Sequence, residues 1–148
     1  RFSLGMTMIE ILIVLSIMAL GAAIVVPMVA GSGVSTGDLK AAARQLAAGL
    51  RLARSEAITQ RHETVLTLDL EKRSFRVAKQ ARAIELPAKV ELKLFTAQSD
   101  LVDERQGSIR FFPDGGSNGG RITVASGERK YEVDVDWLTG RIAILDGP

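Results

Sequence analysis

An uncharged apolar run near the N-terminus constrains this chain more than any other feature. The twenty positions from Ile11 to Ala30 carry no charged side chain, and only Ser16, Gly21 and Pro27 interrupt the apolar residues. As a helix this run would extend about 30 Å, roughly the thickness of the hydrocarbon core of a bilayer. A helix buried in a soluble core usually has a shorter apolar run. We therefore expect a membrane-spanning segment, with a buried core helix as the alternative.

The rest of the chain is long enough for one domain with its own core. The chain has 148 residues with 19 basic and 17 acidic side chains, and residues 1–37 hold one of each. The remaining residues therefore keep the net charge of +2 as an even mixture, unlike the concentrated basic field of a typical nucleic-acid-binding domain. Cysteine is absent, which excludes disulfides and thiolate chemistry.

One carboxylate, Glu10, lies at the start of the apolar run. An ionisable side chain inside a membrane segment costs roughly 2.5–3.5 kcal/mol and usually has a partner and a function. If the chain were cut between Gly5 and Met6, the new amine of Met6 would lie about one helical turn from Glu10 and could pair with it. The alternative is an interfacial carboxylate that only marks the end of a helix.

The segment from Gly5 to Leu15, Gly-Met-Thr-Met-Ile-Glu-Ile-Leu-Ile-Val-Leu, resembles the class III signal of type IV pilins and pseudopilins. The resemblance implies that prepilin peptidase cuts between Gly5 and Met6 and methylates the new amine. It also implies that Glu10, as the fifth residue of the mature chain, acts in assembly. Pro27 lies where the family commonly has a helix-kinking proline. Met6 departs from the phenylalanine that the family most often carries.

These features divide the chain into four parts. Residues 1–5 are interpreted as the remnant of a leader and residues 6–30 as the transmembrane and assembly helix. Residues 31–37 are poor helix formers and predict a hinge. A head is then expected at residues 38–148.

The head begins with an amphipathic helix, for which Asp38 is the predicted N-cap. Its apolar face has four-three spacing and comprises Leu39, Ala43, Leu46, Leu50, Ala53 and Ala57. Basic side chains lie mostly on the other faces and form a basic stripe of Lys40, Arg44, Arg51, Arg54 and Arg61. We interpret the basic stripe as a solvated helix surface, with a binding surface as the alternative.

After His62 the pattern changes to the alternation of β-strands. Turn residues separate the expected strands, which are 64–70, 74–78, 83–86, 89–95, 108–112, 121–125, 130–137 and 141–145. The expected fold class is α+β and type IV pilin-like. A long N-terminal helix, half membrane segment and half amphipathic, would pack on an antiparallel β-sheet or sandwich head.

Three segments of the head, Leu50–Ile58, Ile109–Gly115 and Gly140–Ile142, resemble the GspH/FimT group of minor pilin-like proteins. The resemblance implies a minor pseudopilin of the type II secretion system, the H subunit. This subunit would link a tip complex of I, J and K subunits to the major G subunit, for export of folded proteins across the outer membrane. It would be a single-pass protein of the bacterial inner membrane with its head in the periplasm.

The sequence gives little support for a catalytic site or a metal site. The chain has one histidine, His62, at the end of a charged helix, where a surface or capping role is expected. The glycine-rich segment 115–120 runs between two strands and is expected to be a flexible loop, not a phosphate cradle. Asp114 with Asn118, or Asp134 with Asp136, could supply oxygen ligands to calcium, but neither spacing matches a complete site. We expect no enzyme, cofactor or metal.

The alternative function belongs to another class, a FimT-like minor pilin that binds DNA during natural transformation. Arg141, after Gly140, lies where that group carries basic DNA-contacting residues. A second arginine is expected two positions later, where this chain has Ala143, and the tail then reaches the acidic Asp146. DNA is therefore an unlikely partner by this comparison.

Overall fold

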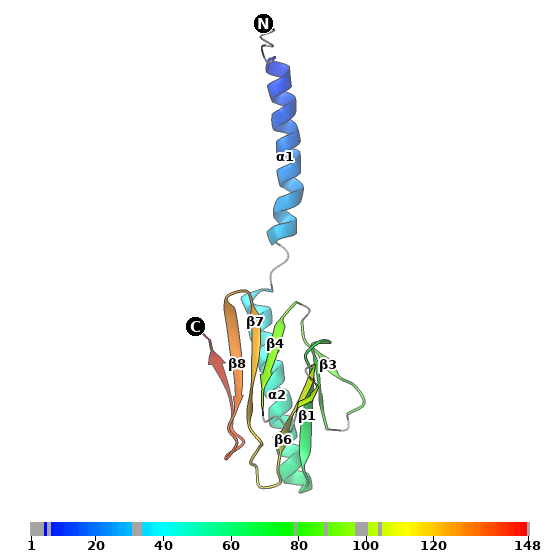
Figure 1. The fold of residues 1–148 in the computed structure, drawn as a ribbon, viewed down its shortest axis with the longest axis vertical. Coiled ribbons are helices and arrows are strands. Elements are labelled where there is room, and N and C mark those ends of the chain that lie inside the picture. The colour runs from blue at the N-terminus through cyan, green and yellow to red at the C-terminus, as the bar shows by residue number, and fades with distance from the viewer. Residues whose placement is uncertain are drawn as a thin grey trace. The chain divides into compact units, whose positions relative to one another are not determined.

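The chain forms two units, each with its own internal contacts, in a computed structural model (Figure 1). The structure describes Gly5 and residues 7–30, 34–78, 80–87, 89–96, 101–103 and 105–147, with side chains except at residues 24–30 and 101–103. The first unit spans residues 1–33 and the second spans residues 34–148. Every buried core residue that the structure describes lies in the second unit, which we call the head.

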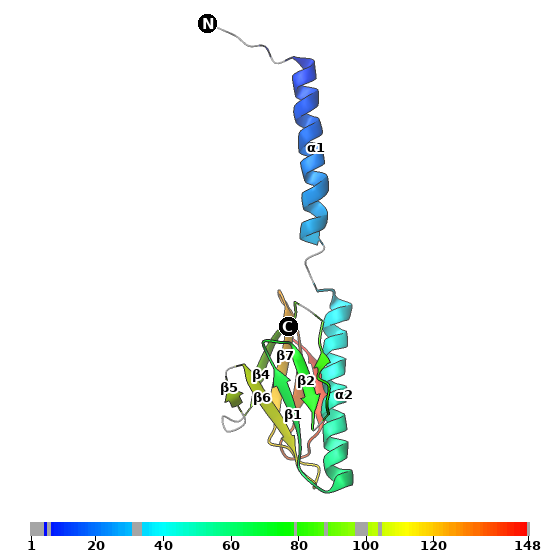
Figure 2. The same cartoon turned by 90° about the vertical axis from the view of Figure 1, so that its right-hand side faces the viewer.

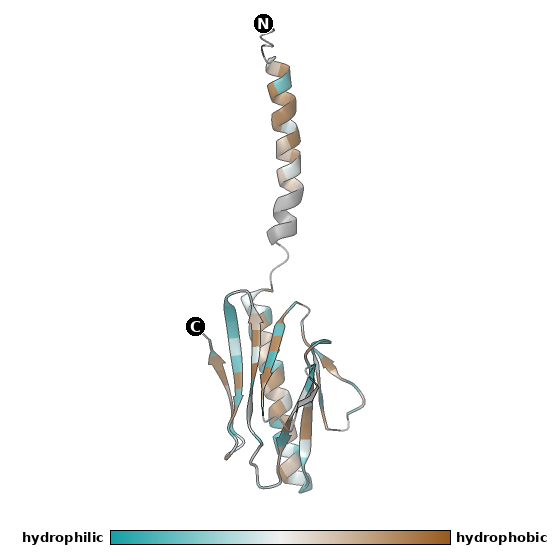
Figure 3. Ribbon diagram, in the orientation of Figure 1, coloured by the Kyte–Doolittle hydropathy of each residue, from teal (hydrophilic) through white to brown (hydrophobic). Residues whose placement is uncertain are grey.

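Helix α1, Met8–Ala30, forms the first unit. Its described residues are mostly apolar, with one hydrophilic band near the N-terminal end (Figure 3), and its large apolar side chains from Met8 to Leu20 are 46–85% exposed. The hydroxyl of Ser16 donates to the Leu12 carbonyl at 2.7 Å, which satisfies this polar group within the helix. In the part of the chain that the structure describes, no helix is long and apolar enough to cross a membrane.

Helix α2, Thr36–Gln60, begins earlier than expected because Ser35, not Asp38, is its N-cap. The Ser35 Oγ accepts a hydrogen bond from the Asp38 amide at 3.1 Å and donates one to the Asp38 carboxylate at 2.8 Å. The predicted cap at Asp38 is therefore wrong, and the carboxylate instead lies in the first turn, where the helix dipole favours it. Of the expected hinge, residues 31–33 lie outside the described residues and residues 36–37 are helical.

The predicted apolar face of α2 is confirmed. All six of its expected residues are buried, as are Ala42, Ala47 and Gly49. Most of these side chains are small, so the helix backbone can lie close to the strands. The helix ends at Arg61, which adopts the left-handed conformation with a φ of 53°.

Five antiparallel strands form the first sheet in the order β3-β2-β1-β6-β5. Their bounds are β1 Thr64–Asp69, β2 Ser74–Val77, β3 Ile84–Glu85, β5 Leu101–Asp103 and β6 Gln106–Phe111. Leu66 of β1 pairs with Val77 of β2 and with Ile109 of β6, and this row is buried. Strand β5 was not predicted; it is short, and its register shifts between Leu101 and Asp103.

Four antiparallel strands form the second sheet in the order β4-β7-β8-β9. Their bounds are β4 Glu91–Phe95, β7 Gly120–Ser126, β8 Arg129–Val135 and β9 Ile142–Asp146. Ile122 of β7 pairs with Val133 of β8, and Val133 pairs with Ile144 of β9. Each of the eight strand ranges expected from the sequence overlaps one observed strand.

Helix α2 lies along one side of both sheets (Figure 2). It contacts β1, β2 and β6 of the first sheet and β7, β8 and β9 of the second. Apolar side chains of the helix and of both sheets therefore share one core, in which Phe75 and Phe111 are the largest fully buried residues. The head is an antiparallel α+β fold, as predicted.

Candidate functional site

Two of the residues expected to act in processing and assembly, Glu10 and Pro27, lie in α1. Gly5 precedes the helix, and Glu10 lies exposed in its first turn. Met6 lies outside the described residues. Pro27 lies within α1, but its side chain is not described. The structure therefore places the Glu10 carboxylate near the start of the helix, where the helix dipole favours a negative charge.

A capping interaction that the sequence analysis missed begins this helix. The Glu10 amide donates to the Thr7 carbonyl at 3.0 Å and to the Thr7 Oγ1 at 3.3 Å. Thr7 and Glu10 have the spacing of a capping box, in which a threonine and a glutamate three residues later cap the helix start. The pattern was visible in the sequence. The contact uses the backbone of Glu10 and leaves its carboxylate exposed.

In the head, one arginine of α2 forms hydrogen bonds with two turns that are remote from it in the sequence. Arg54 of α2 donates from Nε to the Gly115 carbonyl and from Nη2 to the Thr139 carbonyl, each at 3.1 Å. Gly115 belongs to the turn after β6, and Thr139 belongs to the turn between β8 and β9. The guanidinium therefore fixes both turns against the helix, because its rigid fork can serve two acceptors at once.

The same region requires a glycine at position 140. Gly140 has a φ of +67°, and a Cβ built there would lie 2.0 Å from the Gly115 carbonyl oxygen and 2.9 Å from Arg54 Nε. Only glycine tolerates both the conformation and the contact. The β8–β9 turn is thereby packed directly on the turn that follows β6.

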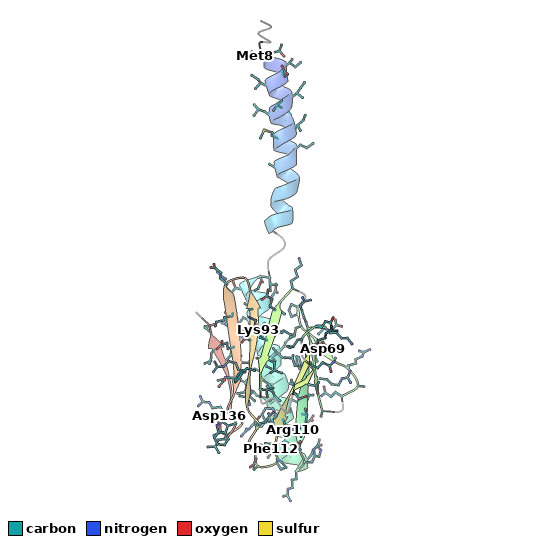
Figure 4. The ribbon with its side chains drawn as sticks, viewed as in Figure 1. Met8, Asp69, Lys93, Arg110, Phe112 and Asp136 are labelled. Atoms are coloured by element: carbon teal, nitrogen blue, oxygen red, sulfur yellow. The ribbon has the colours of Figure 1, made fainter. Side chains whose placement is uncertain are left out.

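Asp136 organises the β8–β9 turn from its beginning (Figure 4). Its Oδ1 accepts hydrogen bonds from the amides of Leu138 at 2.9 Å and Thr139 at 2.8 Å, and from the Thr139 hydroxyl at 3.1 Å. The hydrogen bonds from Thr139 lower the pKa of Asp136, and the charge of Arg141 acts in the same direction. The carboxylate therefore stays ionised and holds the turn at neutral pH.

A groove of about 550 Å³ lies between this turn and α2. Its charged side chains are Arg51, Arg54 and Arg141, and no acidic residue is among the described residues that line it. Ile58 and Ile142 add apolar surface to the groove. Such a groove can accept a carboxylate or phosphate, because guanidinium groups match the planar oxygens of these anions.

The basic stripe lies mostly at the surface of the head, as both interpretations of it require. Lys40, Arg44, Arg51 and Arg61 are exposed, whereas Arg54 is half-buried. The structural role of Arg54 could not be deduced from the sequence because its acceptors lie 61 and 85 residues further along the chain.

The glycine-rich segment between β6 and β7 is held by hydrogen bonds, so the expectation of a flexible loop is wrong. The Ser117 hydroxyl donates to the Arg110 carbonyl at 2.7 Å and accepts from the Gly119 amide at 3.0 Å. Asn118 Oδ1 accepts from the Arg110 amide at 2.9 Å, and Asp114 Oδ1 accepts from the Gly116 amide at 2.8 Å. These side chains stabilise the loop itself.

The two candidate calcium pairs have other partners. Asp134 accepts a hydrogen bond from Arg121 at 3.0 Å, and Asp136 caps the β8–β9 turn. Within the described residues, no three histidine, cysteine or acidic side chains lie close enough together to hold a metal ion.

The surface role expected for His62 is confirmed. The ring is exposed after the end of α2, with Nε2 at 2.6 Å from Gln60 Oε1 and Nδ1 at 2.9 Å from the Glu63 carbonyl oxygen. Both ring nitrogens are therefore engaged with neighbouring residues of the same turn.

Residues 42–140 of this head match the family model described as type II transport protein GspH. The chain belongs to the GspH family. The matched segment contains Arg54, Gly115 and Gly140. The contacts that join α2 to the two turns therefore lie within the residues that match the family model. Arg141 and strand β9 follow it.

A GspH-family relative is similar over most of the chain. The type II secretion system protein H of Xanthomonas campestris pv. campestris is 31% identical over 138 residues, which are 93% of this chain and 80% of that protein. The similarity therefore extends beyond the region of the family match.

Solved structures show the same fold at low identity. The minor pseudopilin EpsH of the Vibrio cholerae type 2 secretion system is 12% identical with a TM-score of 0.59, covering 74% of this chain and 97% of that one. The type IV minor pilin FimU of Pseudomonas aeruginosa is 19% identical with a TM-score of 0.56, covering 76% of this chain and 90% of that one. The type IV pilin-like fold predicted for this GspH-family chain is thus confirmed.

Proposed function

We propose that this chain is the H-type minor pseudopilin of a type II secretion system, a structural subunit of the pseudopilus. The observation that carries this proposal is the family match over residues 42–140. The 31% identity to a type II secretion system protein H over 93% of the chain supports it. The subunit would act by packing beside other pseudopilins.

The first unit is proposed to be the processing and anchoring segment. Prepilin peptidase would cut between Gly5 and Met6 and methylate the new amine, and residues 6–30 would then hold the protein in the inner membrane with the head in the periplasm. The support is the Gly5-to-Leu15 signal pattern together with a helix that begins at Met8 and carries no charged side chain after Glu10. Inside a filament the same apolar surface would contact the helices of neighbouring subunits.

Glu10 is proposed to pair with the N-terminal amine of Met6, within the chain or on a neighbouring subunit. Thr7 caps the helix through its carbonyl and hydroxyl oxygens, which accept from the Glu10 amide, and the exposed carboxylate is not needed for that contact. An apolar helix that retains one carboxylate in its first turn supports a role for the charge itself. Pro27 is proposed to shape α1 for packing in the assembled filament.

The expected partners are the other pseudopilins. As an H subunit, the chain would link the tip complex of I, J and K subunits to the major G subunit. This arrangement follows from the family resemblance, and the exposed cationic groove of the head is one surface that such a contact could use.

The DNA-binding alternative gains no support over this function from the comparisons. Its resemblance requires a second basic residue two positions after Arg141. That position holds Ala143, which pairs across the strands with Asp134. A carboxylate on the neighbouring strand disfavours a phosphate contact there.

Complementation tests the proposal. A strain that lacks this gene should accumulate secretion substrates in the periplasm, and the full chain should restore their export to the medium. Affinity purification of the tagged chain should recover other pseudopilins. Normal export in the deletion strain, together with no recovered pseudopilin, would reject the proposed function.

A further inference from the structure

The β8–β9 turn, residues 136–141, carries two adjacent large apolar side chains at the surface of the head. Trp137 and Leu138 are each 67% exposed. Exposed apolar residues are common singly, but a neighbouring pair that includes tryptophan is typical of a contact surface.

Hydrogen bonds hold the backbone that carries these side chains. Asp136 caps it through the amides of Leu138 and Thr139, and the Gly140 amide donates to the Asp136 carbonyl at 2.9 Å. Arg54 then ties the Thr139 carbonyl to α2. A surface that is already ordered loses little conformational entropy when a partner binds.

Positive charge lies next to the turn that carries this apolar pair. Arg141, in the same turn, and Arg51, on α2, are exposed and line the groove that contains no acidic residue among its described lining. Arginine and tryptophan are the residue types most enriched among the side chains that dominate binding energy at protein interfaces. The two arginines could each form a bidentate contact with a carboxylate.

We infer that the β8–β9 turn, with Arg51 beside it, is the docking surface for another subunit of the filament. The fitting partner presents an apolar pocket for Trp137 and Leu138, edged by carboxylates that face Arg51 and Arg141. This inference rests on the proposed function as a filament subunit.

Charge favours this partner over a second copy of the chain, and the apolar pair favours it over a nucleic acid. A second copy joined symmetrically through the same turn would place arginines against arginines, which is repulsive. A nucleic acid could pair with the arginines but would leave the exposed Leu138 without an apolar contact.

Site-specific photocrosslinking tests the surface in the full chain, expressed together with the other secretion genes. We expect benzoylphenylalanine at position 138 to crosslink to another pseudopilin. The matched control is position 84, where Ile84 is 42% exposed on β3. This position should give no such adduct.

Charge reversal provides the second test of the docking surface. Arg51→Glu combined with Arg141→Glu should lower the adduct from position 138 by about tenfold or more, because like charges now face the partner. Arg82→Glu combined with Arg129→Glu makes the same change in net charge at exposed arginines outside the groove. This control should leave the adduct within about twofold, as for surface charges remote from a contact.

The outcomes separate this inference from the proposed function. If position 138 gives no pseudopilin adduct, or crosslinks to an unrelated protein, while the chain still co-purifies with pseudopilins, the docking surface is wrong and the function stands. A salt-sensitive gel shift with duplex DNA that Arg51→Glu with Arg141→Glu abolishes would also overturn it. If the unaltered chain neither co-purifies with pseudopilins nor supports export, the proposed function itself fails.

Discussion

The Cα of Gly49 in α2 faces the ring of Phe75 in β2 so closely that a Cβ built on Gly49 would lie 2.5 Å from Phe75 Cε2. Phe75 is fully buried in the shared core, where close packing opposes movement of the ring. The absence of a side chain at position 49 therefore sets the distance between the helix and the first sheet.

Gly49→Ala should destabilise the head although alanine favours helices. Overpacking costs about 1–3 kcal/mol and the gain in helix propensity returns about 1 kcal/mol, so we expect a net loss of up to about 2 kcal/mol. Thermal unfolding followed by circular dichroism measures it. Gly37→Ala in the first turn of the same helix is the control, since a Cβ there meets only the Ser35 hydroxyl at 3.6 Å. An equal loss in both variants would argue against the contact with Phe75.

Gly140→Ala should be more severe because it combines a positive φ with a close contact. We expect a loss of about 3 kcal/mol or more in the free energy of unfolding. Gly127→Ala separates the two effects, since Gly127 has a φ of +61° with nothing within 4 Å of its Cβ position. That control should lose only about 1 kcal/mol. Similar losses at both sites would show that the approach of Gly115 is unimportant.

Arg54→Ala should weaken the attachment of both turns to α2. Removing two hydrogen bonds from a charged donor predicts a loss of about 2 kcal/mol in the free energy of unfolding. Arg54→Lys should fall between this variant and the unaltered protein, because one ammonium group cannot reproduce the guanidinium fork. Arg51→Ala, one turn away and exposed, should change stability by less than about 0.5 kcal/mol. Urea unfolding compares the stabilities of the three variants. An unchanged free energy of unfolding in Arg54→Ala would contradict the proposed role of the two hydrogen bonds.

Acidification should loosen the β8–β9 turn through Asp136. The pKa of this carboxyl is lowered in the folded protein from an ordinary value of 3.8, chiefly by hydrogen bonds from Thr139. Its contribution to stability is therefore fully present above the unfolded value and is lost as the pH falls through the lower folded value. Asp136→Asn should reduce the slope of unfolding free energy against pH below about pH 4.

A carboxylate at another turn, Asp69, provides the control for this effect. The pKa of Asp69 is also lowered, chiefly by a hydrogen bond from the Lys72 amide, so Asp136→Asn should leave part of the acid dependence in place. Asp69→Asn should then remove a separate part. Unchanged acid unfolding in the Asp136→Asn variant would show that the cap contributes nothing through its charge.

Changes at Glu10 can separate charge from helix capping. Glu10→Gln keeps the backbone contact with Thr7 and removes the negative charge. Breaking a buried ion pair costs about 3–5 kcal/mol, so both Glu10→Gln and Glu10→Val should strongly reduce co-purified pseudopilins while the protein stays in the membrane fraction. Glu10→Asp should retain part of the function. Assembly of Glu10→Gln at the level of the unaltered protein would refute the charge pairing.

Processing can be tested at Gly5 without disturbing the chain itself, because a Cβ at this position meets nothing within 4 Å. Gly5→Val should block cleavage by prepilin peptidase. Mass spectrometry of the co-expressed protein should then find the leader retained, whereas the unaltered protein should begin at methylated Met6. Identical N-termini in the two proteins would contradict the proposed cut.

Periodicity predicted most elements of the head. The helix face from Leu39 to Ala57 and eight strand ranges followed from spacing, because burial on one side imposes that spacing. Strand β5 has three residues and a shifted register, so no alternation marked it. The helix start was misplaced because Ser35 and Asp38 are both good caps, and only the geometry shows which side chain accepts the amide.

The candidate surface of the head could be predicted only in part. Gly140 and Arg141 were noted as a motif, but the sequence could not show that Gly140 packs on Gly115 or that Arg54 reaches both turns. Such contacts depend on the arrangement of both sheets around α2. The rigidity of the glycine-rich loop was missed for a related reason, since Ser117 and Asn118 bond to the strand that precedes them.

The confinement of the described core to residues after Gly33 has a genetic consequence. Substitutions in the first unit should change location, processing or assembly without changing the unfolding temperature of the head. Substitutions in the core should act first on cellular abundance, because proteases remove unfolded chains. Raising expression should therefore suppress the second class of mutant and leave the first class defective.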